Sequence, residues 1–480
     1  MGGSGSYLAS ASAQAIGRML AIGANLVSVL LVARLLGIEE FGRYAYVMAY
    51  VGIACSLADL GTTSVLARGL AETPEHARGR YFANFWVVRG AITVVATLLA
   101  IGASPFVKPG FGPLLLIGSL AVPFVASRFF DPLFQVCGRP RYTVATNLVY
   151  AFSLIVTSVA ILAWARLSLF AYLISWAACN VLYAVTATVL AVRLIRPRFE
   201  PDREGLRSIV TLAAPLGVGA LFYMLHTRAD TLILSYLRPI HEVGLYSAAF
   251  RLLDLGTVAA TTLLWPLVPI LSQTFRESAA NGREAARRVV ETVGVLSLPI
   301  GMTAPFVAEP VIFALYGERF SDAAPLVAVF GAVFVILSFC LAGAIINISV
   351  GRVRHDYWTT ALAVAVNVSL NLVLIPRFGF AGAAYATFVS HLCMLVVVHY
   401  YANRNVGSIF VRSFWVRVFG INLALLAGLA LFNAREHLMI VVAGVLIYAL
   451  AVWRMQLLAT GNSLSDRTRG ERKARGAPGR

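Results

Sequence analysis

Apolar runs of about twenty residues, separated by short polar turns, recur along the chain from Leu8 to Ala459. Each run is long enough to cross a bilayer as a helix. A helix also satisfies its own backbone hydrogen bonds in lipid. The pattern therefore predicts an all-α polytopic membrane protein with about fourteen transmembrane helices. The runs are 12–36, 45–67, 81–101, 113–137, 143–164, 169–192, 208–234, 244–273, 291–315, 324–350, 357–376, 380–401, 414–433 and 438–458.

The sequence of one polar turn recurs about two hundred residues later in the chain. Residues 38–44 read IEEFGRY, and residues 240–246 read IHEVGLY. A second pair, GRPR at 138–141 and GRVR at 351–354, opens the fifth and eleventh runs. A repeat this long indicates two similar lobes. Six spans return the chain to its starting side, so the two copies should be related by an axis along the membrane normal.

The repeat divides the chain into predicted parts. Residues 1–192 form an N-terminal lobe, and residues 193–207 form a polar link on the cytoplasmic side. Residues 208–403 form a C-terminal lobe, and residues 404–458 add two spans outside the repeat. The basic tail at 459–480 has few apolar residues, so we expect it to be disordered.

Composition and charge agree with a membrane chain. Of the 480 residues, 59% are hydrophobic and only 13% are charged, which leaves too little polar surface for a soluble globule. The net charge of +17 would indicate nucleic acid in a soluble protein, but here the arginines lie in short loops. Alternate loops are arginine-rich, which places both termini in the cytoplasm and predicts no nucleic-acid partner. The arginine-rich loops are 68–80, 139–141, 193–207, 276–288, 352–354 and 404–417.

Chemistry of other kinds has no signature in the chain. The five cysteines lie inside apolar runs without paired spacing, so we expect neither a metal site nor a disulfide framework. No nucleophile motif or phosphate-binding loop appears. We expect no enzyme activity and no cofactor.

Ionisable residues inside a span are expensive and indicate function or pairing. Arg128 and Asp131 are three residues apart on one predicted helix, and Arg251 and Asp254 have the same spacing. Residues at this spacing share a helix face. We expect both to be structural ion pairs.

Three other arginines are candidates for an anion site. Arg18 and Arg89 have no carboxylate at helical spacing, and a guanidinium can bind phosphate bidentately. The alternatives are that Arg18 reaches to the cytoplasmic surface and that Arg89 forms a bridge to Asp59. Arg228 lies about 200° around its helix from both His226 and Asp230, which can pair with each other. Arg228 therefore needs a partner on another helix or on substrate.

Polar residues in the second lobe suggest ion coupling. Asn367 and Asn371 are four residues apart and share a face. They could coordinate a cation together with Asp230, or they could only bond helix to helix. Asp59 is a further coupling candidate. The positions aligned with Arg228 and Asp230 in the first lobe are the uncharged Leu26 and Ser28. The charge is therefore a feature of the second lobe.

Several stretches resemble the Wzx-type polysaccharide-export flippases of the multidrug/oligosaccharidyl-lipid/polysaccharide (MOP) exporter superfamily. The resemblance extends to about Trp453. Its motifs are specific to the superfamily and less specific to substrate. The stretches are ARLLGIEEFGRYAY from Ala33, ADLG from Ala58, RADTLIL from Arg228, EVGLYSAAFRL from Glu242 and NLVLIPRFGFAGAAYAT from Asn371.

The resemblance implies two six-helix lobes around a central cavity, which opens alternately to each side. It implies transfer of an undecaprenyl-diphosphate-linked oligosaccharide from the cytoplasmic to the periplasmic leaflet of a bacterial inner membrane. Arg18, Arg89 and, less directly, Arg228 would hold the diphosphate. The family is thought to use a proton or sodium gradient. The partners would be the bilayer, a polysaccharide polymerase and glycosyltransferases.

Three alternatives stay open at this point. A lipid II flippase would use the same anion chemistry. A multidrug or cation antiporter of the same superfamily should have more carboxylates than arginines inside the membrane, and here arginine is slightly in excess. A membrane enzyme acting on lipid-linked sugars commonly has a long outer loop, and the loops here are short. An enzyme would change the mass of the glycolipid, whereas a flippase changes only its leaflet.

Overall fold

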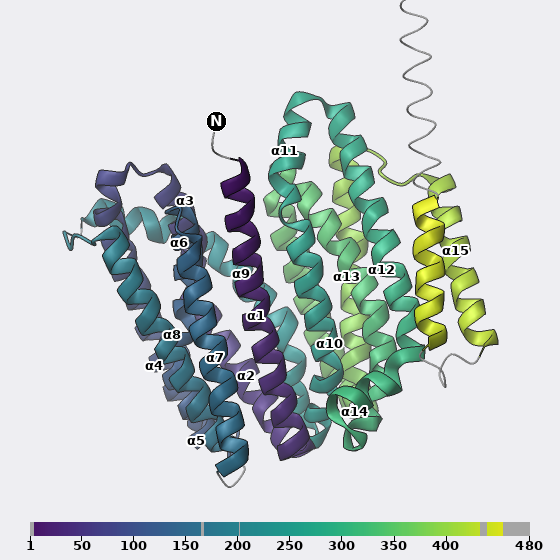
Figure 1. Ribbon diagram of the computed structural model, residues 1–480, viewed down its shortest axis with the longest axis horizontal. Coiled ribbons are helices and arrows are strands. Elements are labelled where there is room, and N and C mark those ends of the chain that lie inside the picture. Colours follow the sequence, from purple (N-terminus) through teal and green to yellow (C-terminus); the bar gives the residue numbers. More distant parts are fainter. Residues whose placement is uncertain (1–3, 165–167, 201, 433–438, 455–480) are drawn as a thin grey trace, which may run out of the picture. The chain divides into compact units, whose positions relative to one another are not determined.

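The computed structural model describes residues 4–164, 168–200, 202–432 and 439–454, without the side chains of residues 4–18 and 162–164. Most of these residues are in helices joined by short turns, and no strand occurs among them, as predicted (Figure 1). The α-helices are α1 (Ser4–Leu36), α2 (Ile38–Asp59), α3 (Thr62–Glu72), α4 (Arg78–Val107), α5 (Gly112–Val125), α6 (Phe130–Val136), α7 (Pro140–Trp164), α8 (Leu169–Ile195), α9 (Arg203–Leu237), α10 (Ile240–Leu264), α11 (Leu267–Glu277), α12 (Ala279–Tyr316), α13 (Ala324–Ser349), α14 (Val353–Val406) and α15 (Arg412–Leu431). Short 3₁₀ helices are η1 (Glu75–Ala77), η2 (Ala126–Phe129) and η3 (Glu318–Ala323).

Twelve helical segments of the described chain are long and apolar enough to cross a membrane. One of them, α14, has 54 residues and contains a break at Gly379, where φ is +58°. The described part of a further apolar helix is Met439–Arg454. The protein is therefore a multi-pass membrane protein, and the count of about fourteen spans stays a prediction.

Several predicted spans are not single helices. The second is interrupted between α2 and α3, where Leu60 and Gly61 both have positive φ. The fourth is divided into α5, η2 and α6, in a region with prolines at 123 and 132. A proline ring clashes with the preceding helical turn and removes one backbone donor. These breaks change which side chains share a face.

The described chain packs as two compact units. The first contains residues 1–248, 315–322 and 357–390, and the second contains residues 249–314, 323–356 and 391–480. Within the first unit, α1 lies beside α7, and α9 packs against α2 and α3 (Figure 1). Within the second, an apolar core joins α12, α13 and α15 through side chains such as Val290, Ile346 and Val418. The predicted lobe boundaries at 192 and 208 stay a prediction.

The two copies of the repeated turn contact each other within the first unit. Gly42 at the start of α2 faces the first turn of α10 so closely that a Cβ would overlap the Ile240 carbonyl. That Cβ would also lie 3.0 Å from the Gly244 nitrogen. In turn, a Cβ on Gly244 would overlap the Ile38 carbonyl. Glycine is required at both positions because only backbone fits between the helices.

The link before α9 is docked on the start of α4. Asp202 caps α9 by accepting from the Gly205 amide. It also accepts from Asn84 Nδ2 at 3.1 Å and pairs with Arg80 at 3.1 Å. Bonding to the charged carboxylate holds the pKa of Asp202 below its ordinary value, with the Gly205 amide as the largest cause. The link is therefore fixed to α4 by a carboxylate that stays ionised.

Candidate functional site

A buried carboxylate in the first unit is held by uncharged donors. Asp230 on α9 is only 1% exposed. Its oxygens accept from Tyr246 Oη at 2.8 Å, Thr387 Oγ1 at 2.6 Å and Asn371 Nδ2 at 2.6 Å. These donors come from α10 and from both halves of α14. A buried charge is costly unless it is paired or bound to a cation.

The neighbours of Asp230 supply further oxygen atoms. Asn371 Nδ2 donates to Asn367 Oδ1 at 3.0 Å, so both asparagines lie on the predicted shared face. Asn371 Oδ1 is buried and has no hydrogen-bond partner among the described residues. Carboxylate and amide oxygens are the ligands that hard cations prefer. The cluster therefore brings together Asp230, Asn367 and Asn371, and it presents an acceptor that no protein donor occupies.

Sequence reasoning missed two members of this cluster. Tyr246 is the last residue of the repeated turn, but its place in the repeat was the only signal for it. Thr387 lies at the end of the second-lobe motif and carries no charge, so nothing distinguished it from other small polar residues. His226 is buried one turn before Asp230, and Arg228 is partly buried on α9.

The structure differs from the expectation that Arg89 offers a guanidinium to an anion. The Arg89 side chain on α4 is buried and forms an ion pair with Asp59 on α2. It also donates to Thr62 Oγ1 and to the Ala126 carbonyl, both at 2.7 Å, and lies 5.3 Å from the Phe129 ring centre. The alternative of a bridge to Asp59 is therefore the correct one. Asp59 also accepts from Thr63 Oγ1, and its role in ion coupling stays a prediction.

The predicted ion pair between Arg128 and Asp131 is wrong. The Arg128 guanidinium lies 4.4 Å and 4.0 Å from the ring centres of Tyr150 and Tyr183, and it donates to Asn147 Oδ1 at 2.8 Å. Asp131 accepts instead from Tyr183 Oη at 2.9 Å. The prediction assumed one straight helix, but Arg128 lies in η2 and Asp131 in α6. Tyr183 thus contacts both charged residues, Arg128 through its ring and Asp131 through its hydroxyl.

One further predicted ion pair and one further predicted anion ligand remain. Arg251 Nη1 and Asp254 Oδ2 on α10 are 4.0 Å apart, so this predicted ion pair is confirmed. The side chain of Arg18 lies outside the described residues. Its role as an anion ligand stays a prediction.

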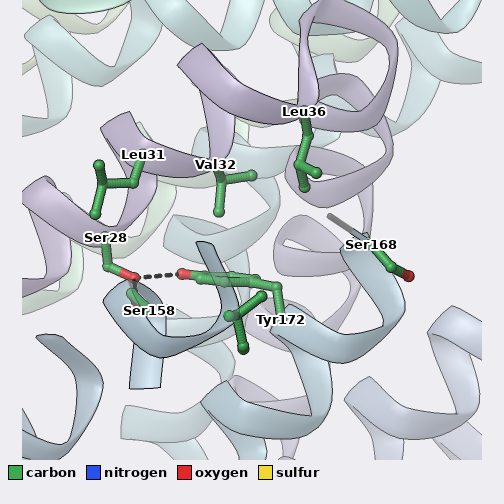
Figure 2. A pocket seen from close by; sticks show the side chains of 8 residues that line it. Ser28, Leu31, Val32, Leu36, Ser158, Ser168 and Tyr172 are labelled. Carbon is green, nitrogen blue, oxygen red and sulfur yellow. Dashed lines mark hydrogen bonds between the residues drawn. The ribbon is translucent and has the colours of Figure 1, made fainter. Parts of the chain in front are cut away.

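A small pocket in the first unit lies between α1, α7 and α8. Figure 2 shows the Tyr172 hydroxyl pointing at Ser28 Oγ, with the two oxygens 2.9 Å apart. Ser158 Oγ is 2.8 Å from the same Ser28 oxygen. The rest of the lining is largely apolar, with Leu31, Val32, Leu36 and Ile161. The pocket therefore has a hydroxyl cluster on one wall, and among the described residues that line it the tyrosine is the single ionisable group.

Comparison with known proteins places the chain in a family. The family described as "Polysaccharide biosynthesis protein" matches residues 31–325. The chain belongs to this family. The match contains the first copy of the repeated turn, the second copy and the Asp230 side chain.

Relatives of this polysaccharide biosynthesis protein are named for export or biosynthesis. The "Probable flippase AglR" of Haloferax volcanii is 26% identical over 362 residues, which are 74% of this chain and 75% of AglR. The "Capsular polysaccharide biosynthesis protein CapF" of Staphylococcus aureus is 20% identical over 44% of this chain and 53% of CapF. The predicted resemblance to polysaccharide flippases is confirmed.

Solved structures show the same fold. The lipid II flippase MurJ in an inward closed conformation has a TM-score of 0.74 and 13% identity, covering 94% of this chain and all of MurJ. An inward-facing multidrug resistance MATE transporter of the MOP superfamily has a TM-score of 0.66 and 14% identity, covering 80% of this chain and 94% of that protein. This chain therefore has the fold of MOP-superfamily transporters.

Proposed function

We propose that this protein flips an oligosaccharide carried on undecaprenyl diphosphate from the cytoplasmic to the periplasmic leaflet of a bacterial cytoplasmic membrane. Family membership and the MOP-type fold support transport of a lipid-linked sugar. Both termini lie in the cytoplasm in this proposal. Glycosyltransferases supply the substrate on that side, and a polymerase consumes it on the other.

Anion recognition rests on arginine. Arg228 lies on α9, two residues before the buried Asp230, and a guanidinium matches a phosphate group bidentately. Arg18 is the second ligand that we propose. Arg89 is not proposed, because its donors are used by Asp59 and by backbone.

The Asp230 cluster couples transport to a cation gradient. The observation that carries this proposal is a carboxylate that is 1% exposed and lies beside a buried amide oxygen with no described donor. A sodium ion or a proton at Asp230 would neutralise the charge and use the free acceptor of Asn371. Binding on one side and release on the other would then make the conformational change depend on the gradient.

The test uses purified protein in proteoliposomes loaded with a lipid-linked oligosaccharide. The fraction of glycan exposed outside is measured with a lectin, with and without a sodium or proton gradient. Asp230→Asn should abolish the gradient dependence, and Asn371→Ala should weaken it. The control is Asp322→Asn, which removes an exposed carboxylate from η3. Unchanged gradient dependence in Asp230→Asn would reject the coupling site.

The same vesicles separate a flippase from the other classes. A flippase leaves the mass of the glycolipid unchanged, and an enzyme alters it. Arg228→Ala should reduce the rate of flipping, and Arg228→Lys should restore only part of it, because lysine lacks the planar fork. Equal rates for wild type and Arg228→Ala would remove this residue from the anion site.

A further inference from the structure

The pocket of Figure 2 occupies the place in the first repeat that the Asp230 cluster occupies in the second. Ser28 stands ten residues before Ile38, and Asp230 stands ten residues before Ile240. Ser158 stands twenty residues after Gly138, and Asn371 stands twenty residues after Gly351. The reference residues Ile38, Ile240, Gly138 and Gly351 all belong to the two pairs of repeated turns. The repeat therefore pairs Ser28 with Asp230 and Ser158 with Asn371.

The side-chain contacts agree with this equivalence between the two repeats. Ser28 and Ser158 Oγ atoms are 2.8 Å apart, and Asp230 Oδ1 and Asn371 Nδ2 are 2.6 Å apart. Both contacts join the first helix of a repeat to its fifth. The equivalence of the two sites is therefore supported both by the sequence register and by the side-chain contacts.

The tyrosine of the repeated turn takes part in both copies. Tyr246 donates to Asp230 at 2.8 Å. Its counterpart Tyr44 packs edge-on against Tyr172, with ring centres 5.7 Å apart, and Tyr172 supplies the hydroxyl beside Ser28. In each copy the helix that follows the fifth span contributes one hydroxyl, from Tyr172 or from Thr387.

The two copies differ in charge. Among the described residues, fully buried Ser28 bonds to two hydroxyl groups, each of which can donate and accept. The described side chains of the first copy can therefore satisfy Ser28 without an ion. The second copy has a carboxylate, which accepts only, and an amide oxygen without a described donor. A bare sodium ion would gain little from hydroxyls alone and would lose its hydration.

We infer that the first-lobe pocket is an uncharged copy of the second-lobe cation site, so that each chain binds one cation and the first lobe binds none. This inference rests on the proposed coupling site at Asp230. The identity of two side chains, Ser28 and Ser158, decides the difference.

The experiment counts bound radioactive sodium ions per purified chain at saturating sodium and alkaline pH. Wild type should bind one, and Asp230→Asn should bind none. The double variant Ser28→Asp/Ser158→Asn should bind two. Adding Asp230→Asn to that double variant should return the count to one, now held by the first lobe.

The outcomes separate the two proposals. If wild type binds no sodium, the sodium form of the coupling site fails, whatever the first lobe does. If wild type binds one ion and Asp230→Asn none, the coupling site holds. A folded Ser28→Asp/Ser158→Asn variant that still binds one ion then overturns the inference about the first lobe. Two ions in wild type would overturn it as well.

If the double variant does not fold, the reciprocal exchange of side chains provides a second test of the inference. Asp230→Ser/Asn371→Ser gives the second lobe the side chains of the first. It should bind no sodium and should unfold at a higher temperature than Asp230→Ala/Asn371→Ala, because serine hydroxyls can repeat the network around Ser28. An unfolding temperature no higher than that of the alanine variant would reject the equivalence of the two sites.

Discussion

The contact between the two repeated turns makes a measurable prediction about Gly42. Replacing Gly42 by alanine places a methyl group against the backbone of α10, with the Ile240 carbonyl overlapped and the Gly244 nitrogen at 3.0 Å. Backbone atoms cannot rotate away as a long side chain can. The overlap is relieved only if α2 and α10 separate.

The expected cost follows from two opposing effects. Overpacking of a filled contact costs about 1–3 kcal/mol. Alanine gains about 0.5–1 kcal/mol over glycine inside a helix. The net loss should therefore lie between about 0 and 2.5 kcal/mol, and the backbone overlap places it near the upper value. Gly244→Ala should behave alike, because its Cβ overlaps the Ile38 carbonyl.

Thermal unfolding of the purified protein in one detergent measures the effect. The matched control is Gly90→Ala in α4, where a Cβ meets nothing within 4 Å and the variant should be unchanged or more stable. The double variant Gly42→Ala/Gly244→Ala should lose less than the sum of the single losses, because one separation of the helices relieves both overlaps. Strict additivity, or a Gly42→Ala variant as stable as the Gly90→Ala control, would refute the backbone contact.

Two further predictions concern charged side chains. Arg89→Ala should lower the free energy of unfolding by at most about 3–5 kcal/mol, because it leaves the Asp59 carboxylate unpaired. The control is Arg68→Ala, which removes an exposed arginine. Equal unfolding temperatures for Arg89→Ala and Arg68→Ala would contradict a structural role for Arg89. The depressed pKa of Asp202 means that its contribution to stability is present above about pH 4 and is lost as the pH falls through the folded pKa. The protection of the Arg198 amide, which donates to the Gly79 carbonyl, against hydrogen exchange is measured relative to the intrinsic exchange rate at each pH, and in wild type it should fall at acid pH. In Asp202→Asn this protection should be low at every pH, and identical protection profiles for the two proteins would contradict the docking of the link.

Sequence alone was sufficient for the fold class, and it also contains the repeated turn, whereas the division into two lobes stays a prediction. Long apolar runs have few structural outcomes in lipid, and the repeat of IEEFGRY as IHEVGLY requires no alignment of homologues. The same turn also contained Gly42 and Gly244, but only the structure shows that these copies contact each other. A sequence repeat gives equivalence of position and carries no information about distance.

The candidate site was less predictable, because its members lie far apart in the chain. Asp230, Asn367 and Asn371 were predicted from charge and helical spacing, and they do lie together. Arg89 and Asp59 are on different helices, so spacing could not decide between a bridge and a free guanidinium. Helical spacing misled for Arg128 and Asp131, because a 3₁₀ turn changed the geometry between them.

Glu242 gives the second repeat a mechanical property that the first one lacks. Its carboxylate accepts from the Phe380 amide at 2.9 Å, where α14 resumes after Gly379, and from Arg238 at 2.8 Å. One turn further along α10, Tyr246 holds Asp230 and lies 3.4 Å from Thr387, two turns beyond Phe380. Two attachments on the same pair of helices oppose rotation of one about the other. Glu40, the counterpart in the first repeat, pairs locally with Arg43. The Asp230 cluster and the turn at Glu242 are therefore attached to the same part of α14 at two points along α10.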